Sequence, residues 1–312
     1  MDLWKPHYDP CEIHFLFLLV EDGLTQLERQ CDSWSKWVLN ATCRDIIIVV
    51  YVDDLSLGCN CLQMLNFIKD ELKKRFNISD IGEIDFMLKM KIQRHRASRR
   101  LFLSQPQYIK EMIRHYGMEN AKPAATPQAA GVALEPGPRL SPEEAANPKY
   151  PYRNLIGSLM HLQRCTRPDI SNAVRDLARY QHCYTSVHFN ALNRVLRYLK
   201  GTSDYGLLFD GSNPTDQVVK VYSDASFGDK ELSRKSVTGY AVKLAGVPVC
   251  YCSVAQKSVS ISTMEAELIA CSEACRESEW LRMLLGDMGF EYEAPVQVFC
   301  DNQATVALIK NP

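Results

Sequence analysis

The feature that most constrains this 312-residue chain is a pair of adjacent aspartates that follows an almost wholly apolar run. The run Ile46–Val50 leads into Tyr51-Val52-Asp53-Asp54, and a second apolar stretch continues to Gly58. This pattern predicts a strand, a tight turn and a second strand. Adjacent carboxylates repel each other, so a divalent cation is their natural partner, but Asp is also common in ordinary turns. Spacing alone therefore leaves a metal-binding turn and a plain hairpin both open.

Composition indicates a globular protein. The chain is 46% hydrophobic and 23% charged, and its length allows two or three domains with real cores. A net charge of −1 gives no overall attraction to nucleic acid. The 12 cysteines are scattered and form no Cys-x-x-Cys pair, which favours a reducing, intracellular compartment. The apolar run Ile13–Val20 is far too short to span a membrane, so no membrane partner is expected.

Two segments of the chain concentrate positive charge, although the net charge of the whole chain is close to zero. The segment 88–100 has no acidic residue, and its basic residues are Lys89, Lys91, Arg94, Arg96, Arg99 and Arg100. The segment 151–205 is also rich in Lys and Arg. Both are candidate surfaces for contacting nucleic-acid phosphates, with a solvated basic face as the alternative.

The first half of the chain reads as a strand-rich region followed by a linker. Within residues 1–120, apolar spacing predicts a helix over 62–76, a hairpin formed by Phe86–Ile92 and Arg100–Leu103, and a helix over 106–116. Residues 121–150 are rich in Pro, Ala and Gly, which predicts a linker.

The second half combines a helical block with a mixed sheet. Residues 151–212 are predicted to be helical, because apolar residues recur at i, i+3, i+4 and i+7 near Leu192. Residues 216–312 then predict three strands, a helix, a strand and a further helix, which is typical of a mixed α/β sheet.

A second set of carboxylates lies in this last region. Asp224 ends its first strand and Asp301 follows its fourth strand, while the intervening helix begins with Glu265 and Glu267. Carboxylates on two strand ends and a crossing helix can converge on a divalent ion, as two-metal hydrolysis of a phosphodiester requires. Taken singly, Glu265 also suits a helix start and Asp301 an N-cap.

Four groups of motifs, in order, resemble the carboxyl-terminal part of copia-type retrotransposon polyproteins. The Tyr51–Asp54 turn resembles the metal-binding hairpin of their reverse transcriptase palm. The other groups resemble, in turn, the thumb region, the connection region and the ribonuclease H domain. Their residues are Leu72–Phe76, Asp80–Glu83 and Leu103–Ile109; then Pro151–Arg153, Ile156–Leu159, Thr166–Ile170 and Arg197–Thr202; then Tyr222–Ala225, Arg234–Ser236, Thr238–Tyr240, Met264–Glu267 and Cys300–Ala304.

The resemblance implies a multidomain α+β and α/β fold that binds Mg²⁺ or Mn²⁺. It matches Asp53 and Asp54 to the two palm aspartates, and Asp224 and Asp301 to two ribonuclease H ligands. The third ribonuclease H ligand is either Glu265 or Glu267. We prefer Glu267, because the apolar residues that follow it resemble the family pattern. Implied partners are an RNA–DNA hybrid or a template-primer, with deoxynucleotides in the intact enzyme, in cytoplasmic particles or the nucleus.

The family pattern extends beyond this chain at both ends. Family polymerases carry a third palm aspartate and a fingers subdomain upstream, and their ribonuclease H continues past Pro312 to a fourth acidic ligand. We therefore expect a fragment without polymerase activity and with residual ribonuclease H activity at best. The alternatives are a catalytically dead remnant that binds nucleic acid and a domesticated interaction protein.

Overall fold

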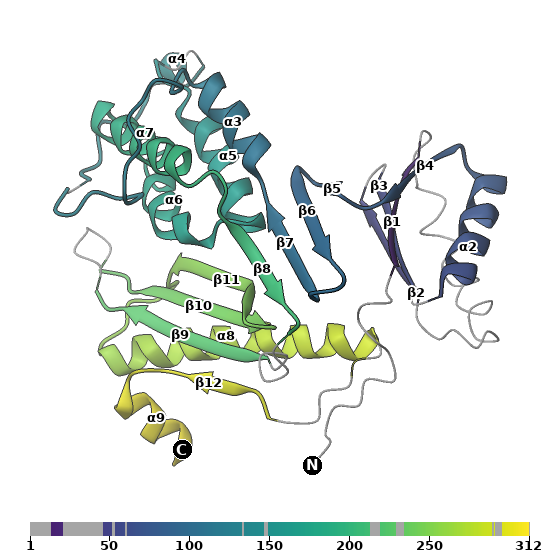
Figure 1. Ribbon diagram of the computed structural model, residues 1–312. Helices are drawn as coiled ribbons and strands as arrows, with labels where there is room; N and C mark the ends of the chain where they lie inside the picture. Colours follow the sequence, from purple (N-terminus) through teal and green to yellow (C-terminus); the bar gives the residue numbers. More distant parts are fainter. Residues whose placement is uncertain are drawn as a thin grey trace. The chain divides into compact units, whose positions relative to one another are not determined.

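The structure is a computed structural model that describes residues 14–20, 46–51, 54–59, 61–132, 134–146, 149–212, 219–228, 234–288, 290 and 295–311. It is a mixed α+β fold with several small sheets (Figure 1). The chain divides into two compact units. The first comprises Met1–Met87, Arg94–Arg100 and Arg282–Glu293, and the second comprises Leu88–Gln93, Leu101–Leu281 and Ala294–Pro312.

The first unit contains a four-stranded antiparallel sheet and a helix that packs on it. The sheet order is β2-β3-β1-β4. The elements are β1 (His14–Val20), β2 (Ile46–Tyr51), β3 (Asp54–Cys59), α2 (Leu62–Arg75) and β4 (Ile78–Glu83). Tyr51 pairs with Asp54, so β2 and β3 are the hairpin that the apolar runs predict.

A small apolar core holds this sheet to its helix. Leu55, Leu57 and Cys59 of β3 are buried against α2. The buried residues of α2 recur at helical spacing and are Leu65, Ile68 and Leu72. The helix predicted over 62–76 is therefore confirmed to within one residue.

The strand predicted over Phe86–Ile92 is interrupted, so this part of the hairpin prediction is wrong. β5 (Phe86–Met87) and β6 (Met90–His95) are separated by Leu88 and Lys89, whose φ angles are 51° and 62°. Two successive residues with positive φ form a tight turn that usually contains Gly or Asn. Neither residue is present here, so no local sequence pattern predicts the turn. β6 is followed by β7 (Arg100–Ser104), which lies between β6 and β8 (Gly206–Asp210).

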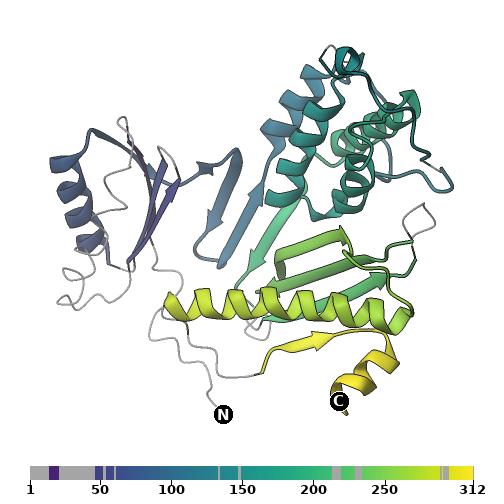
Figure 2. The same ribbon diagram turned by 180° about the vertical axis from the view of Figure 1, so that it is seen from behind.

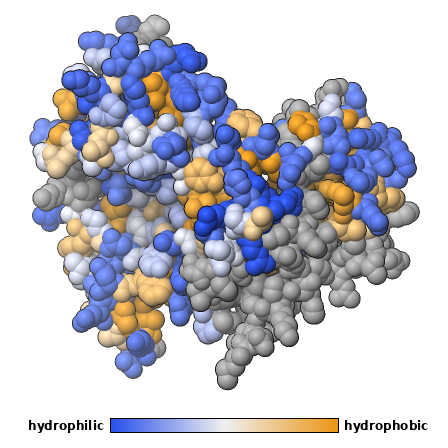
Figure 3. Space-filling model, viewed as in Figure 1, coloured by the Kyte–Doolittle hydropathy of each residue, from blue (hydrophilic) through white to orange (hydrophobic). Residues whose placement is uncertain are grey.

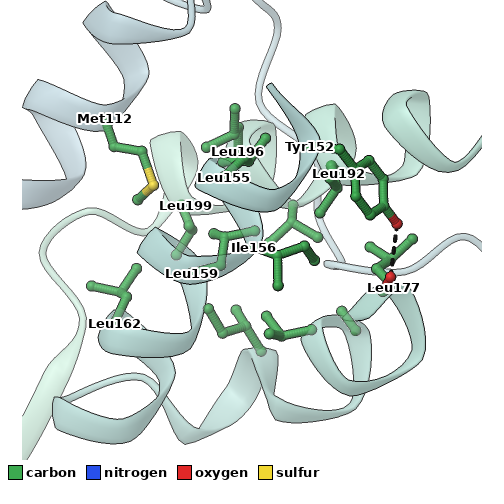
Figure 4. Packing of buried hydrophobic residues seen from close by; sticks show 14 of the residues in the cluster. Met112, Tyr152, Leu155, Ile156, Leu159, Leu162, Leu177, Leu192, Leu196 and Leu199 are labelled. Carbon is green, nitrogen blue, oxygen red and sulfur yellow. Dashed lines mark hydrogen bonds between the residues drawn. The ribbon is translucent and has the colours of Figure 1, made fainter. Parts of the chain in front are cut away.

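Five helical segments in the second unit share one core. They are α3 (Pro106–His115), α5 (Tyr152–Cys165), the 3₁₀ helix η3 (Pro168–Ile170), α6 (Ser171–Ala178) and α7 (Ser186–Gly201). Figure 4 shows Leu155, Leu159 and Leu196 interdigitating at its centre. The Tyr152 hydroxyl donates to the Leu177 carbonyl at 2.8 Å, which satisfies a buried polar group. The helices predicted over 106–116 and near Leu192 are both present.

The Pro-rich segment 121–150, predicted as a linker, is hydrogen-bonded to this helical block along its length. Ala124 N–H donates to the Arg197 carbonyl, and Gly137 N–H donates to the Cys183 carbonyl at 2.9 Å. The Tyr180 hydroxyl donates to the Leu134 carbonyl at 2.6 Å. One short helix, α4 (Pro142–Ala146), forms within the segment. A composition that prevents regular structure does not prevent backbone groups from bonding to a neighbouring surface.

The end of the second unit is a four-stranded sheet in the order β11-β10-β9-β12. β10 is antiparallel to both β9 and β11, whereas β12 is parallel to β9. The elements are β9 (Lys220–Ser226), β10 (Val237–Leu244), β11 (Val247–Ala255), α8 (Thr263–Asp287), β12 (Gln297–Phe299) and α9 (Gln303–Lys310). Figure 2 shows α8 lying across one face of this sheet. The predicted order of three strands, helix, strand and helix is therefore confirmed.

The connection through α8 explains why β12 is parallel to β9. A strand that returns to the same sheet after a helix on one face adds in parallel. β12 is an edge strand, and apolar side chains of β12 and α9 are exposed on the surface (Figure 3). They are Val298, Phe299, Leu308 and Ile309.

Candidate functional site

Two aspartates lie near the carboxyl ends of the parallel strands β9 and β12. Phe299, the last residue of β12, pairs with Tyr222; Asp224 follows Tyr222 by two residues within β9, and Asp301 follows Phe299 by two residues beyond β12. Both aspartates line an open cavity of about 490 Å³. The parallel pairing thus brings together two residues that are distant in the sequence.

Glu267 completes the cluster from the start of α8. Its side chain is buried, with 6% of the residue exposed, and its Oε1 accepts a hydrogen bond from Ala225 N–H at 3.1 Å. Its Oε2 accepts a hydrogen bond from the Cys300 thiol over 3.9 Å. Ligand atoms of Glu267, Cys300 and Asp301 all lie within 4.8 Å of one another. These three residues and Asp224 are called the acidic cluster below.

Glu265 has a different role in the same helix. Its Oε2 accepts a hydrogen bond from Ile261 N–H at 2.7 Å, and its own N–H donates to Ser262 Oγ at 3.1 Å. These two bonds cap the helix in a variant of the Ser-x-x-Glu arrangement, in which the carboxylate bonds the residue before the capping Ser262. Of the two glutamates that the sequence left open, Glu267 lies in the acidic cluster and Glu265 caps the helix.

The negative charges of the cluster act on one another. Burial raises the pKa of Glu267, and the charges of Asp224 and Asp301 raise it further, although the hydrogen bond from Ala225 N–H opposes them. Burial also raises the pKa of the Cys300 thiol, and the neighbouring Glu267 adds to that effect. A site with this excess of negative charge favours a bound cation.

The hairpin of the first unit presents one described carboxylate. Asp54 is half-buried at the start of β3, where it pairs with Tyr51 on one side and Leu19 of β1 on the other. Asp53, the second predicted ligand of this hairpin, lies outside the described residues.

The six predicted phosphate-contacting residues do not share one face. Along β6, Lys91 is exposed whereas Arg94 lies on the opposite, half-buried face. Lys89 Nζ is 4.9 Å from the centre of the Tyr108 ring, a cation–π contact. Arg96 Nη2 is 2.7 Å from Glu83 Oε1. Arg99, which has a φ of 54°, and Arg100 are both exposed.

Cys300 and Ser223 lie close to the predicted site residues but were not themselves predicted to take part in the site. Cys300 directly precedes Asp301, and this adjacency is the only sequence sign that it joins the cluster. Ser223 is 7% exposed and lines the same cavity as Asp224. Among the described residues, no helix is long and apolar enough to cross a membrane.

Comparison with known proteins extends over most of the chain. Residues 24–130 match the family described as reverse transcriptase (RNA-dependent DNA polymerase). The chain is 38% identical over 268 residues to the Retrovirus-related Pol polyprotein from transposon TNT 1-94 of Nicotiana tabacum, a match that covers 85% of this chain and 20% of the polyprotein. It is 35% identical over 281 residues to that from transposon RE2 of Arabidopsis thaliana, covering 89% of this chain and 18% of the polyprotein.

A shorter relative is matched over most of its own length. It is a putative transposon Ty5-1 protein of Saccharomyces cerevisiae, 31% identical over 238 residues, covering 74% of this chain and 73% of the relative. By contrast, the chain spans only about a fifth of the length of the tobacco and Arabidopsis polyproteins. The chain belongs to the reverse transcriptase family of copia-type retrotransposon Pol polyproteins.

Proposed function

We propose that the end of the second unit, from Val219 onward, is a ribonuclease H-like site that hydrolyses the RNA strand of an RNA–DNA hybrid. The observation that carries this proposal is the convergence of Glu267 and Asp301, with Asp224 on the paired strand β9 near enough for its charge to raise the pKa of Glu267. Carboxylates gathered at adjacent strand ends are what metal-assisted phosphodiester hydrolysis requires.

The donor atoms of the acidic cluster suit a divalent metal. Three carboxylates offer the hard oxygen ligands that Mg²⁺ prefers, or Mn²⁺ in its place. The cavity that Asp224 and Asp301 line is open, so a phosphodiester has access to them. When bound, the metal activates water and stabilises charge on the phosphate.

The chain's own residues hold this arrangement in place. Ala225 N–H fixes one oxygen of Glu267, and β9–β12 pairing sets the relative height of the two aspartates. The buried Thr305 hydroxyl donates to the Met264 carbonyl at 3.1 Å and ties α9 to α8. The ligands are thus preorganised before metal and substrate arrive.

The comparisons support the proposal through their extent. An alignment that covers 89% of the chain leaves too few residues unmatched to omit the whole segment from Val219 onward. For the whole polyprotein, the family also supports a second role, in which Asp54 and its neighbour Asp53 would help to hold the polymerase metal on a template-primer that is extended with deoxynucleotides.

A cleavage assay on a labelled RNA–DNA hybrid tests the first proposal. We expect cleavage of the RNA strand that requires Mg²⁺ or Mn²⁺ and is lost in Asp224→Asn, Glu267→Gln and Asp301→Asn. Glu265→Gln is the matched control, because this glutamate sits in the same helix but serves as a cap. Cleavage that persists in all three site variants would contradict the proposal.

A further inference from the structure

The Pro-rich segment and the helical block form the walls of a cavity that plays no part in the proposed hydrolysis. The cavity has a volume of about 1330 Å³ and lies between residues 127–136 on one side and the helices α6 and α7 on the other. Its described lining residues all belong to the second unit, and none belongs to the acidic cluster. Because small-molecule sites usually measure about 300–1,000 Å³, this cavity has room for an organic ligand.

Two arginines of α7 line this cavity without a carboxylate partner. Arg194 and Arg197 are both half-buried. Arg194 Nη2 donates to Thr126 Oγ1 at 3.0 Å, and Arg197 Nε donates to the Lys122 carbonyl at 2.6 Å. Both acceptors are neutral, and among the described residues no carboxylate pairs with either guanidinium. Residues three apart on a helix share one face, with Cβ atoms about 5–6 Å apart, so the two positive charges are neighbours.

One nitrogen of these guanidiniums also lacks a hydrogen bond. Arg194 Nε is buried and has no hydrogen-bond partner in the part of the chain that the structure describes. A half-buried cation without a counter-charge and a buried donor without an acceptor are both unfavourable. An anion in the cavity relieves both, because a guanidinium binds a phosphate through parallel N–H···O bonds.

The other charged groups of the cavity do not neutralise the two arginines. Asp176 lines the cavity, but its Oδ1 lies 2.5 Å from Arg175 Nη2, which compensates its charge. Glu135 and Arg179 also line the cavity, both are exposed, and their charges are opposite. The charge that remains is positive and lies on α7, so the cavity favours an anionic ligand.

The remaining walls suit an organic body as well as a phosphate. Val132 and Val187 line the cavity and are 53% and 50% exposed, so they offer apolar surface to a flat ring. Asn190 of α7 is exposed on the same cavity. Its amide carries both donors and an acceptor, which is the chemistry that reads the edge of a base. Phosphate, flat ring and polar ring edge together describe a nucleotide.

We propose that this cavity binds a free nucleoside diphosphate, with its phosphates on Arg194 and Arg197 and its base against Val132 and Val187. Two neighbouring arginines match two linked phosphates. A nucleic-acid strand carries only one charge per phosphate and presents its phosphates one nucleotide apart, which favours the free ligand. The inference goes beyond the proposed ribonuclease H-like site and does not depend on it.

Calorimetric titration of the full chain with ADP tests the inference. Divalent metal is removed, so that no metal in the acidic cluster contributes to phosphate binding. We expect Arg194→Gln to weaken ADP binding at least tenfold, and Arg194→Gln combined with Arg197→Gln to abolish it. Lys200→Gln is the matched control, because Lys200 also lies on α7 and donates to the Ala121 carbonyl at 2.9 Å but does not line the cavity. Thermal unfolding of each variant shows that it is folded.

A second control separates anion binding from a purely structural role of Arg194. If Arg194 acted only by holding the Pro-rich segment through Thr126, then Thr126→Val would weaken ADP binding as much as Arg194→Gln does. We expect Thr126→Val to keep the affinity within about threefold, because the guanidinium stays in place. Equal losses in Thr126→Val and Arg194→Gln, or an ADP affinity that is unchanged in the double arginine variant, overturn the inference.

Two further ligands test what the cavity recognises. Pyrophosphate should bind several-fold more weakly than ADP, because it contacts the arginines but has no base to lie against the valines. Equal affinities for the two would overturn the assignment of the base to the cavity. A 5′-phosphorylated single-stranded oligonucleotide should show no binding that depends on Arg194. Arg194-dependent binding of this strand that is tighter than that of ADP would assign the cavity to nucleic acid and overturn the free ligand.

Discussion

The two carboxylate sites of this chain are built in opposite ways. The hairpin site takes Asp53 and Asp54 from consecutive positions, whereas the acidic cluster takes its residues from β9, α8 and β12. The first pair is adjacent in the sequence and needs no tertiary contact to be close. The second set comes together only through a parallel strand pairing and a helix that crosses the sheet. A contiguous motif is therefore easy to recognise in a sequence, but a dispersed one gives more geometric evidence once the fold is known.

The carboxylates of the two regions also differ in burial and in the charges around them. Asp54 is half-buried on a strand, with Tyr51 and Leu19 as its strand neighbours. Glu267 is buried and within reach of two other acidic residues, and its pKa is raised. Elsewhere in the first unit, burial alone would raise the pKa of Asp80, but the hydrogen bond and charge of Lys69, with help from Lys73, lower it. Charge is therefore compensated at Asp80 and left uncompensated in the acidic cluster, as expected where a cation is to bind.

The largest effect that we expect separates the two glutamates of α8. Glu267→Gln should lower the rate of hybrid cleavage about 100- to 1,000-fold, because a lost metal ligand costs several kcal/mol and 1.36 kcal/mol is tenfold in rate. Glu265→Gln should leave the rate within about threefold and instead cost roughly 0.5–1 kcal/mol of stability through the weakened cap. Single-turnover cleavage and urea unfolding of both variants measure the two effects. Equal losses of activity in the Glu267→Gln and Glu265→Gln variants would contradict the assignment of Glu267 to the site and Glu265 to the helix cap.

A smaller effect tests whether the dispersed site depends on packing far from its ligands. Thr305 is fully buried, and its hydroxyl joins α9 to α8 through the Met264 carbonyl. Thr305→Val keeps the shape and removes the bond, which should cost about 1 kcal/mol. Cleavage should fall several-fold, because α9 follows Asp301 directly. Thr126→Val, on the exposed Pro-rich segment, is the control and should leave cleavage unchanged. Full activity in Thr305→Val would show that the cluster is held by the strands alone.

The raised pKa of Glu267 should make the free energy of unfolding depend on pH. The folded state holds the proton of the Glu267 carboxyl more tightly than the unfolded chain does. The free energy of unfolding therefore falls as the pH rises from about 4.5, the ordinary pKa of a Glu side chain, through the raised pKa of Glu267. Glu267→Gln removes this penalty. Without divalent metal, the variant should therefore gain stability relative to the unsubstituted chain across that window, and the difference should level off above it. Urea unfolding at several pH values measures it, and a difference that does not change with pH would contradict the assignment.

The sequence predicted the elements of the acidic cluster better than its contacts. Apolar spacing in the sequence was sufficient to predict β9 to β11, α8 and α9. In α8 this spacing matches burial, because its buried residues recur at helical intervals, whereas α9 buries only Thr305. Three features depended on the tertiary structure. The turn at Leu88 and Lys89 has positive φ without Gly, the Pro-rich segment bonds to the helical block, and Cys300 lies beside Glu267. In each case the determining contact is non-local or contrary to residue propensity, so no local pattern reveals it.

The smallest effect concerns the basic residues of the first unit, which contribute charge rather than precise geometry. We predict weak binding of an RNA–DNA hybrid, with log K falling against log salt at a slope of about −3 to −5, from roughly −0.9 per phosphate neutralised. Replacing Arg94, Arg96, Arg99 and Arg100 by Gln should flatten that slope, because four positive charges are lost. The loss of the solvent-accessible Arg96–Glu83 ion pair should itself cost little stability.

Arg96 differs from Arg99 and Arg100 in exposure, because it is half-buried whereas they are exposed. Arg96→Gln alone should therefore change the slope less than Arg99→Gln and Arg100→Gln together, since these two exposed residues are consecutive at the end of the β6–β7 turn and the start of β7. Hybrid titrations at several salt concentrations measure each slope, and Lys110→Gln on α3 serves as the control. Affinity that does not depend on salt, or a slope unchanged in the quadruple variant, would mean that the segment 88–100 is a solvated basic face that does not contact nucleic acid. Nucleic-acid binding would then depend on the acidic cluster and its metal, and the contrast between the two regions would be sharper.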